Sequence, residues 1–172
     1  VVPESLARHL PDPAATAEFG ALLAGALLAV APASLVLYFD GELGAGKTAL
    51  IRALMVGLGH RGRVPSPTYT LVEPYALDRY HVVHVDLYRL REPAELDDLG
   101  LHDELRPREA GRGYLLLAEW PGRGVGRLPP ADLECQLVSA GTGRDVFLAA
   151  KTGVADRLLR KLCSQLSETG YR

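Results

Sequence analysis

The stretch Gly41-Glu-Leu-Gly-Ala-Gly-Lys-Thr48, or GELGAGKT, decides the predicted fold of this chain. It matches G-x-x-x-x-G-K-[ST], the pattern of a loop that binds the phosphates of a nucleoside triphosphate. Glycines let backbone N–H groups turn toward phosphate oxygens, where a side chain would block the approach. Lys47 would bring positive charge to the β- and γ-phosphates, and the Thr48 hydroxyl would ligate Mg²⁺. The predicted nucleotide contacts of this stretch are Gly41, Glu42, Leu43, Gly44, Ala45, Gly46, Lys47, Thr48 and Ala49.

The residues on either side of GELGAGKT supply the strand and the helix that such a loop connects. Upstream, residues 34–39 (SLVLYF) form a short apolar run typical of a buried parallel strand. Downstream, residues 49–58 carry apolar side chains at helical spacing, and Gly57 and Gly59 mark the end of the helix. The helix is expected to open at about Lys47, where its positive dipole end adds to the anion site. This order of elements predicts an α/β domain of the P-loop NTPase type.

The rest of the chain alternates further strands and helices. The dipeptide Asp12-Pro13 is a helix start signal. Apolar spacing predicts helices over residues 16–29 and 154–166, helical stretches within 87–105, and strands over 68–73, 81–86, 114–118, 133–138 and 145–150. The layout predicts a single domain over residues 1–172, with a mostly parallel central sheet flanked by helices. The amphipathic helix in the C-terminal segment 151–172 is expected to pack on the core, with a partner surface as the alternative.

Composition narrows the class of protein and its setting. A length of 172 residues, with 48% hydrophobic and 23% charged residues, is typical of a soluble globular domain. The net charge of −2 argues against binding RNA or DNA mainly through counterion release, although a partner could present a nucleic acid. The two cysteines match no metal or redox spacing, which favours a reducing cytosol. Residues 21–33 (ALLAGALLAVAPA) resemble a signal-peptide core but are too short to span a membrane, so we expect a buried helix packed on the sheet and no membrane partner.

Two carboxylates are candidates for the acidic partner that a P-loop requires. Asp86 closes the apolar run at 81–86, and Glu119 closes the run at 115–119. Both are therefore expected at the carboxyl edge of the sheet, where ligands of open α/β folds bind. Either could hold Mg²⁺ or its waters. The alternative for each is a solvated acid at a strand end, and the spacing leaves open which is the direct ligand.

Several other residues have both a functional and a structural interpretation. Thr68, in Ser66-Pro-Thr-Tyr-Thr70, could sense a γ-phosphate as switch loops do, or belong to a rigid entry to a strand. Trp120 could pack in the core, and Arg144 could contact a base or phosphate or be solvated. The spacing of His81 and His84 places them on opposite faces of a strand, which argues against a shared metal site. No Asn-Lys-x-Asp guanine-reading motif occurs, so ATP is favoured over GTP.

The motifs taken together resemble one family. Their order along the chain is Leu10-Pro-Asp, Thr16 with Gly20, GELGAGKT, SPTYTLVEPY at 66–75, HVDLYRL at 84–90, Glu95-Leu and Glu119-Trp-Pro. This combination resembles the bacterial TsaE (YjeE) family, the ATPase of tRNA threonylcarbamoyladenosine biosynthesis. The resemblance covers roughly residues 10–150, and only the P-loop is shared with other ATPases. Ala49 departs from the family pattern, in which many members carry a second threonine.

The resemblance implies a cytoplasmic protein that works with TsaD and TsaB, which install threonylcarbamoyl on the adenosine beside the anticodon of ANN-decoding tRNAs. Members of this family hydrolyse ATP weakly and sustain cycling of the complex. The resemblance does not specify whether this chain itself contacts tRNA. Carried over to this sequence, the implied roles are phosphate binding by Lys47, Mg²⁺ ligation by Thr48 and Glu119, a Walker B-like acid at Asp86, a switch-like Thr68, and nucleotide contacts by Trp120, Thr16 and Arg144.

Two other functions fit the same loop. A small-molecule kinase could use Asp86 as its base and the arginine-rich loops as a lid, but the sequence contains no distinct constellation for an acceptor substrate. A non-enzymatic nucleotide switch would dock a partner on ATP binding, with incidental hydrolysis. The sequence does not separate this switch from an ATPase.

Overall fold

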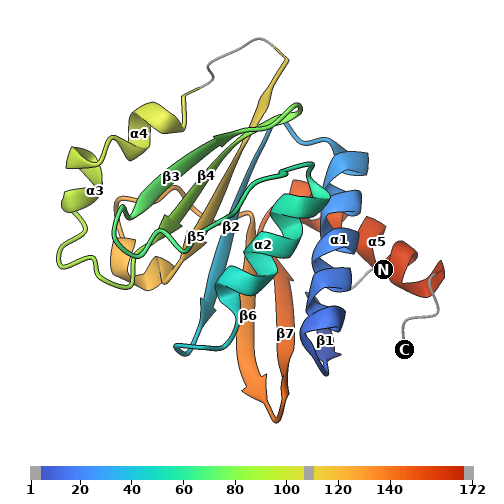
Figure 1. Ribbon diagram of the computed structural model, residues 1–172. Helices are drawn as coiled ribbons and strands as arrows, with labels where there is room; N and C mark the ends of the chain where they lie inside the picture. Colours follow the sequence, from blue (N-terminus) through green and yellow to red (C-terminus); the bar gives the residue numbers. More distant parts are fainter. Residues whose placement is uncertain (1–4, 107–110, 169–172) are drawn as a thin grey trace.

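A seven-stranded mixed sheet forms the centre of the molecule (Figure 1). The computed structural model describes residues 5–106 and 111–168. Strand order across the sheet is β1-β7-β6-β2-β5-β4-β3. The strands are β1 (Ser5–Leu10), β2 (Ser34–Gly41), β3 (Val72–Ala76), β4 (Tyr80–Asp86), β5 (Gly113–Glu119), β6 (Leu133–Ala140) and β7 (Gly143–Ala150). The four central strands β6, β2, β5 and β4 are parallel, as predicted, whereas β1, β7 and β3 add antiparallel pairs at the edges.

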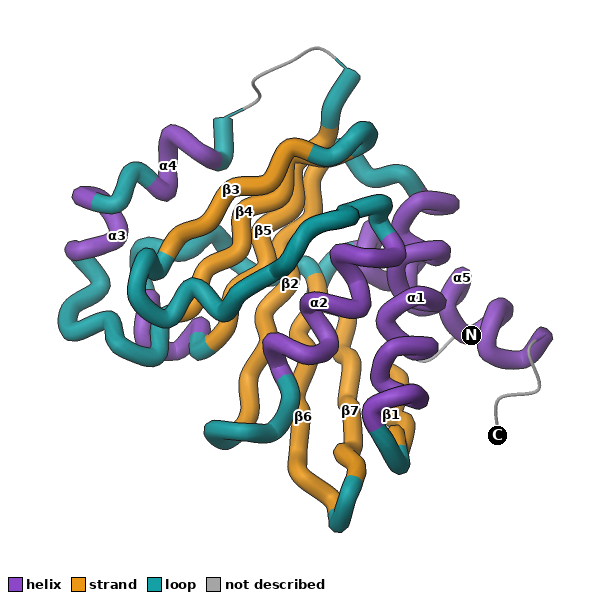
Figure 2. The backbone as a smooth tube through the Cα atoms, viewed as in Figure 1, coloured by secondary structure: helices purple, strands orange, loops and turns teal. Residues whose placement is uncertain are grey.

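Helices cover both faces of this sheet, most heavily on the face that carries the larger core (Figures 1 and 2). On that face lie α1 (Pro13–Val30), α2 (Lys47–Gly57) and α5 (Gly153–Glu168). On the other face, α3 (Glu95–Asp98) and α4 (Leu101–Glu104) bury Leu96 and Leu101 over the strands. A short 3₁₀ helix, η1 (Pro121–Gly124), follows β5. Successive strand residues point to opposite faces, so β2 gives Leu35 and Leu37 to one core and Val36 to the other.

Helix α1 is the long apolar helix whose sequence resembles a signal-peptide core. It starts as predicted at Asp12, whose side chain accepts a hydrogen bond from the Ala15 N–H at 2.7 Å, with Pro13 in the first turn. By length and composition alone it could cross a membrane. In this fold it packs against α2 and α5 and buries Phe19, Leu23 and Leu27 in the core, which confirms the predicted core helix.

The C-terminal helix is also a core element. Four leucines of α5, at positions 158, 159, 162 and 166, are buried in the same core as α1. Their spacing is the helical face that the sequence indicated. This placement settles the alternative between core and partner surface for that face, because it is covered by the chain itself. The end of the predicted segment 151–172 lies beyond residue 168, outside the described residues.

Two local features of the structure differ from the sequence-based prediction. Residues 68–71 are not part of a strand, because the Leu71 N–H donates to the Pro67 carbonyl at 2.8 Å and closes a helix-like turn before β3. Strand β1 was not predicted; it is held by antiparallel pairing with β7, far away in the sequence. The helical stretches predicted within 87–105 are present as two single turns, and they are separated as expected at Gly100, which lies in the left-handed region (φ 71°).

Candidate nucleotide site

The GELGAGKT loop connects β2 to α2 at the carboxyl edge of the parallel strands. Gly41 has a φ of 144°, and a Cβ there would lie 2.3 Å from the Leu137 carbonyl oxygen, so no other residue fits. Gly46 has a φ of 100° and precedes α2 without any side-chain cap. The first N–H groups of α2 therefore have no partner within the helix and carry its positive dipole end. This arrangement suits an anion such as a phosphate.

Lys47 is buried at this loop, with only 4% of the residue exposed. Its Nζ donates to the Gly41 carbonyl at 2.6 Å and to the Glu42 carbonyl at 2.9 Å, and lies 4.0 Å from the centre of the Trp120 ring. Burial lowers the pKa of the Lys47 ammonium, while the carboxylates of Glu119, Asp40 and Asp86 act in the opposite direction. The loop thus holds one cation at the helix N-terminus.

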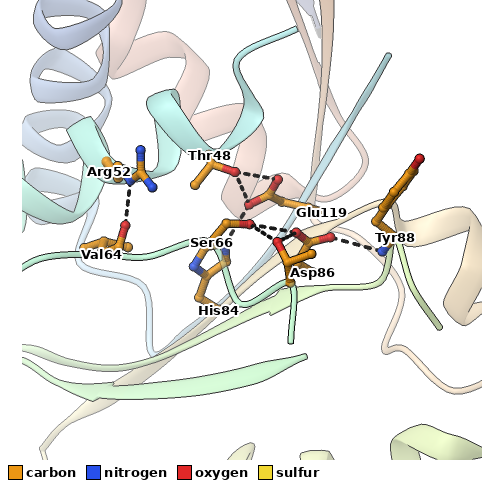
Figure 3. Close-up of polar contacts among 9 residues, drawn as sticks. Thr48, Arg52, Val64, Ser66, His84, Asp86, Tyr88 and Glu119 are labelled. Atoms are coloured by element: carbon orange, nitrogen blue, oxygen red, sulfur yellow. Dashed lines mark hydrogen bonds and ion pairs between the residues drawn. The ribbon is translucent and has the colours of Figure 1, made fainter. Parts of the chain in front are cut away.

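The side chains of Thr48 and Glu119 point toward each other (Figure 3). The Thr48 hydroxyl lies 2.9 Å from each carboxylate oxygen of Glu119. His84 contacts the same carboxylate, with Nε2 2.8 Å from Oε1. Among residues 5–106 and 111–168, no three His, Cys, Asp or Glu side chains converge as a metal cage. A hydroxyl and a carboxylate are nevertheless the hard oxygen donors that Mg²⁺ takes together with substrate phosphates, so the predicted pair fits that ion.

Asp86 lies next to Glu119, because the two residues are paired in register at the ends of β4 and β5. One of its oxygens accepts from Ser66 Oγ at 2.8 Å and lies 3.4 Å from Thr68 Oγ1, and the other accepts from the Tyr88 N–H at 3.0 Å. The predicted switch residue Thr68 therefore faces the predicted acid. Ser66 makes the shorter contact, although the sequence drew attention to it only as part of the SPTYT stretch.

One cavity of about 420 Å³ unites these groups. Ten predicted site residues line it, among them Lys47, Thr48, Thr68, Asp86, Glu119 and Trp120. Leu43, Gly44, Gly46 and Ala49 complete the loop side, while Ser66, Tyr88 and Arg89 were not predicted. Gly41, Glu42 and Ala45 do not line it; the first two hold Lys47 through their carbonyls, and Ala45 is buried beneath the loop. The Trp120 ring lies against Lys47 and Tyr88, so it forms part of the wall as well as packing on the core.

Thr16 and Arg144, the two remaining predicted contacts, lie together in a second cavity of about 340 Å³. Its wall is mainly apolar and comes from α1 and α2, and Ala49 lines both cavities. The Arg144 guanidinium lies against the P-loop, with Nη1 3.4 Å from the Gly46 carbonyl oxygen. Its buried Nε has no hydrogen-bond partner among the described residues. The two cavities therefore adjoin at the start of α2; the first holds the charged side chains of Lys47, Asp86 and Glu119, and the second is mainly apolar.

His84 is the main site residue that sequence reasoning missed. The spacing of His81 and His84 argues only against a shared metal site, and the two rings do contact different partners, Glu104 and Glu119. A positive signal was present, since His84 precedes Asp86 by two residues and so shares its face of the strand. The contact with Glu119 depends on the register of β4 and β5, which the sequence does not reveal.

The fold and this site together define an α/β protein of the P-loop NTPase type. The family model described as "Threonylcarbamoyl adenosine biosynthesis protein TsaE" matches residues 10–146. The chain therefore belongs to the TsaE family, as its motifs indicated.

Individual relatives agree with this assignment. The tRNA threonylcarbamoyladenosine biosynthesis protein TsaE of Haemophilus influenzae is 37% identical over 157 residues, which is 91% of this chain and 96% of that protein. The protein of the same name from Bacillus subtilis is 35% identical over 132 residues, covering 77% of each chain. The crystal structure of Bacillus subtilis YdiB has the same fold, with a TM-score of 0.67 at 24% identity, and covers 94% of this chain and 95% of that one.

Proposed function

We propose that this chain binds and hydrolyses ATP as the nucleotide-dependent subunit of threonylcarbamoyladenosine formation on tRNA. The observation that carries the proposal is the convergence of Lys47, Thr48, Asp86 and Glu119 on one cavity at the N-terminus of α2. Membership of the TsaE family, whose relatives are named for this biosynthesis, supplies the pathway. The proposal includes a cytoplasmic location and TsaB and TsaD as partners.

In this proposal the two adjoining cavities bind different parts of the nucleotide. The loop N–H groups and Lys47 would hold the phosphates, and Thr48 with Glu119 would hold Mg²⁺, which neutralises phosphate charge. The second cavity would take the adenosine, with its base against the apolar side chains of α1 and α2 and with Thr16 and Arg144 as polar contacts. Ala49, which lines both cavities, would lie beneath the junction.

Hydrolysis would depend on the acid and the loop on the far side of the phosphate cavity. Asp86 is fixed by the Ser66 hydroxyl and the Tyr88 N–H, so its carboxylate is set to orient an attacking water. Thr68, at 3.4 Å from the same carboxylate, lies on the loop before β3 and would follow the γ-phosphate. The net charge of −2 makes delivery of tRNA by the partners the simplest arrangement.

Calorimetric titration with ATP, in excess Mg²⁺ and in EDTA, tests this assignment. Lys47→Ala should weaken binding by about tenfold or more, because hydrogen bonds to charged groups contribute about 1.5–3 kcal/mol each. Glu119→Ala should weaken binding only when Mg²⁺ is present. The matched control is Lys151→Ala, which removes an exposed lysine paired with Glu134 and should leave the affinity unchanged.

Two outcomes would change the assignment. Wild-type affinity in Lys47→Ala would remove the loop from the nucleotide site. An unaltered Mg²⁺ dependence in Glu119→Ala would move the metal role to Asp86. Asp86→Ala should still bind ATP but hydrolyse it slowly, and this variant separates an ATPase from a switch for which binding alone is enough.

A further inference from the structure

His84 is a fully buried polar residue at the edge of the nucleotide site. It lies on β4, two residues before Asp86, with 0% of the residue exposed. Figure 3 shows its ring directed at Glu119, and the distance from Nε2 to Oε1 is 2.8 Å. An ionised carboxylate only accepts hydrogen bonds, so the His84 ring donates this hydrogen bond from its Nε2–H group to Glu119 Oε1.

Packing does not explain a histidine at this position. The other ring nitrogen, Nδ1, is buried and has no hydrogen-bond partner among the residues that the structure describes. A buried polar atom without a partner costs about 1–3 kcal/mol, and an apolar side chain would avoid that cost. Its strand neighbours Val82, Val83 and Val85 are all apolar and buried. The contact with Glu119 is therefore the feature that distinguishes His84 from its neighbours.

The two oxygens of Glu119 differ in what they contact. Oε1 accepts from His84 Nε2 and lies 2.9 Å from the Thr48 hydroxyl, whereas the one hydrogen-bond partner of Oε2 among the described residues is that hydroxyl, also at 2.9 Å. The His84 bond thus fixes one oxygen on the strand side. The second oxygen, Oε2, therefore faces Thr48 and the cavity that Thr48 and Glu119 both line.

We propose that His84 is a positioning residue that holds Glu119 Oε1, so that Oε2 and the Thr48 hydroxyl are presented together to Mg²⁺. The inference rests on the proposed function, since it assigns an oxygen to the ion of that site. A glutamate side chain has several freely rotating bonds, and ordering it costs rotamer entropy. His84 imposes this order before the ion arrives, as hydrogen-bond partners of ligating carboxylates do in other metal sites.

The chain contains a matched pair that serves as a control. His81 contacts Glu104 at 3.0 Å, and these side chains are 12% and 22% exposed. This pair joins β4 to α4, and neither residue lines the nucleotide cavity. The effect of losing a histidine–carboxylate contact on β4 can therefore be compared between two pairs. Of these, only His84–Glu119 includes a residue that lines the nucleotide cavity.

The experiment compares His84→Gln, His84→Asn and His84→Leu with His81→Asn. The Gln amide nitrogen reaches about as far as Nε2 and can donate to Glu119, whereas the shorter Asn amide cannot. ADP affinity is measured in excess Mg²⁺ and in EDTA, with the melting temperature of each variant in EDTA. We expect Asn and Leu to lose about tenfold or more of the Mg²⁺-dependent affinity, because such partners contribute 10–100-fold to metal binding. Gln should retain most of it, and the EDTA affinities and His81→Asn should match the wild type.

The results also separate the inference from the proposed function. If His84→Asn retains the wild-type Mg²⁺ dependence, or loses affinity equally in EDTA, His84 does not position a metal ligand. Adding His84→Asn to Glu119→Ala should cause no further loss, and additive losses would contradict an action through Glu119. If His84→Leu does not fold, the comparison of His84→Gln with His84→Asn still tests whether a hydrogen bond to Glu119 supports the Mg²⁺-dependent affinity. A wild type that binds neither ADP nor ATP in the presence of Mg²⁺ would overturn the proposed function itself.

Discussion

At the scale of residues, the contact between Lys47 and Trp120 links the P-loop to the end of β5. The ammonium lies 4.0 Å from the ring centre, within the range of a cation–π interaction. It also donates to two loop carbonyls, so two of its three N–H groups are hydrogen-bonded without a ligand. Phosphates would compete for the same ammonium, and binding must therefore alter the surroundings of the Trp120 ring.

Trp120 is the only tryptophan in the chain, so tryptophan emission comes from this ring alone. Saturating ATP with Mg²⁺ should give a change in emission that titrates with the calorimetric affinity. Lys47→Ala should start from a different spectrum and show no change at the same ATP concentrations. An unchanged wild-type spectrum at saturation would show that the ring does not sense the nucleotide.

At the scale of elements, the close packing of α1 on α2 shapes the apolar cavity. Gly20 lets the two helices approach, because a Cβ at this position would lie 2.3 Å from Ala53 Cβ and 2.9 Å from its backbone carbon. Thr16, one turn earlier on α1, and Ala53 both line the cavity proposed for the base. The spacing between the helices therefore fixes the width of that cavity.

Gly20→Ala should lower the free energy of unfolding by about 1–3 kcal/mol through overpacking, and should weaken ATP binding. Gly25→Ala is the matched control on the same helix, since its Cβ would meet only the end of the flexible Gln165 side chain at 3.2 Å. This control should be neutral or stabilising by up to about 1 kcal/mol, because alanine favours helices over glycine. Chemical denaturation measures both, and equal stabilities would contradict the tight contact at Gly20.

The elements around the P-loop were predictable, since β2, the loop and α2 rely on local signals such as apolar runs and glycines. The start of α1 at Asp12 was predictable for the same reason. The errors came from long-range or unusual backbone contacts: β1 depends on pairing with β7, and the turn at residues 67–71 replaced a strand. In the site, Asp86 and Glu119 followed from their places at strand ends, whereas the role of His84 required the register between strands.

At the scale of the whole molecule, the sheet order gathers the site at one edge. β2 lies between β5 and β6, and β4 lies beyond β5, so the loop after β2 is next to Glu119 and close to Asp86. Ligands of open α/β sheets bind at such carboxyl ends. On the other side of α2, the cavity of Thr16 and Arg144 joins α1 to β7. Residues as far apart in the sequence as Pro13 and Arg144 thus meet around the start of one helix.

The measurement that tests the central claim most directly is ATP hydrolysis by this chain with and without purified TsaB, TsaD and tRNA. Lys47→Ala is measured in parallel. We expect slow hydrolysis by the chain alone, a rate that changes when the partners are present, and loss of activity in the variant. A hydrolysis rate that does not change when the partners are added, or that persists in Lys47→Ala, would contradict a partner-coupled ATPase built on this loop.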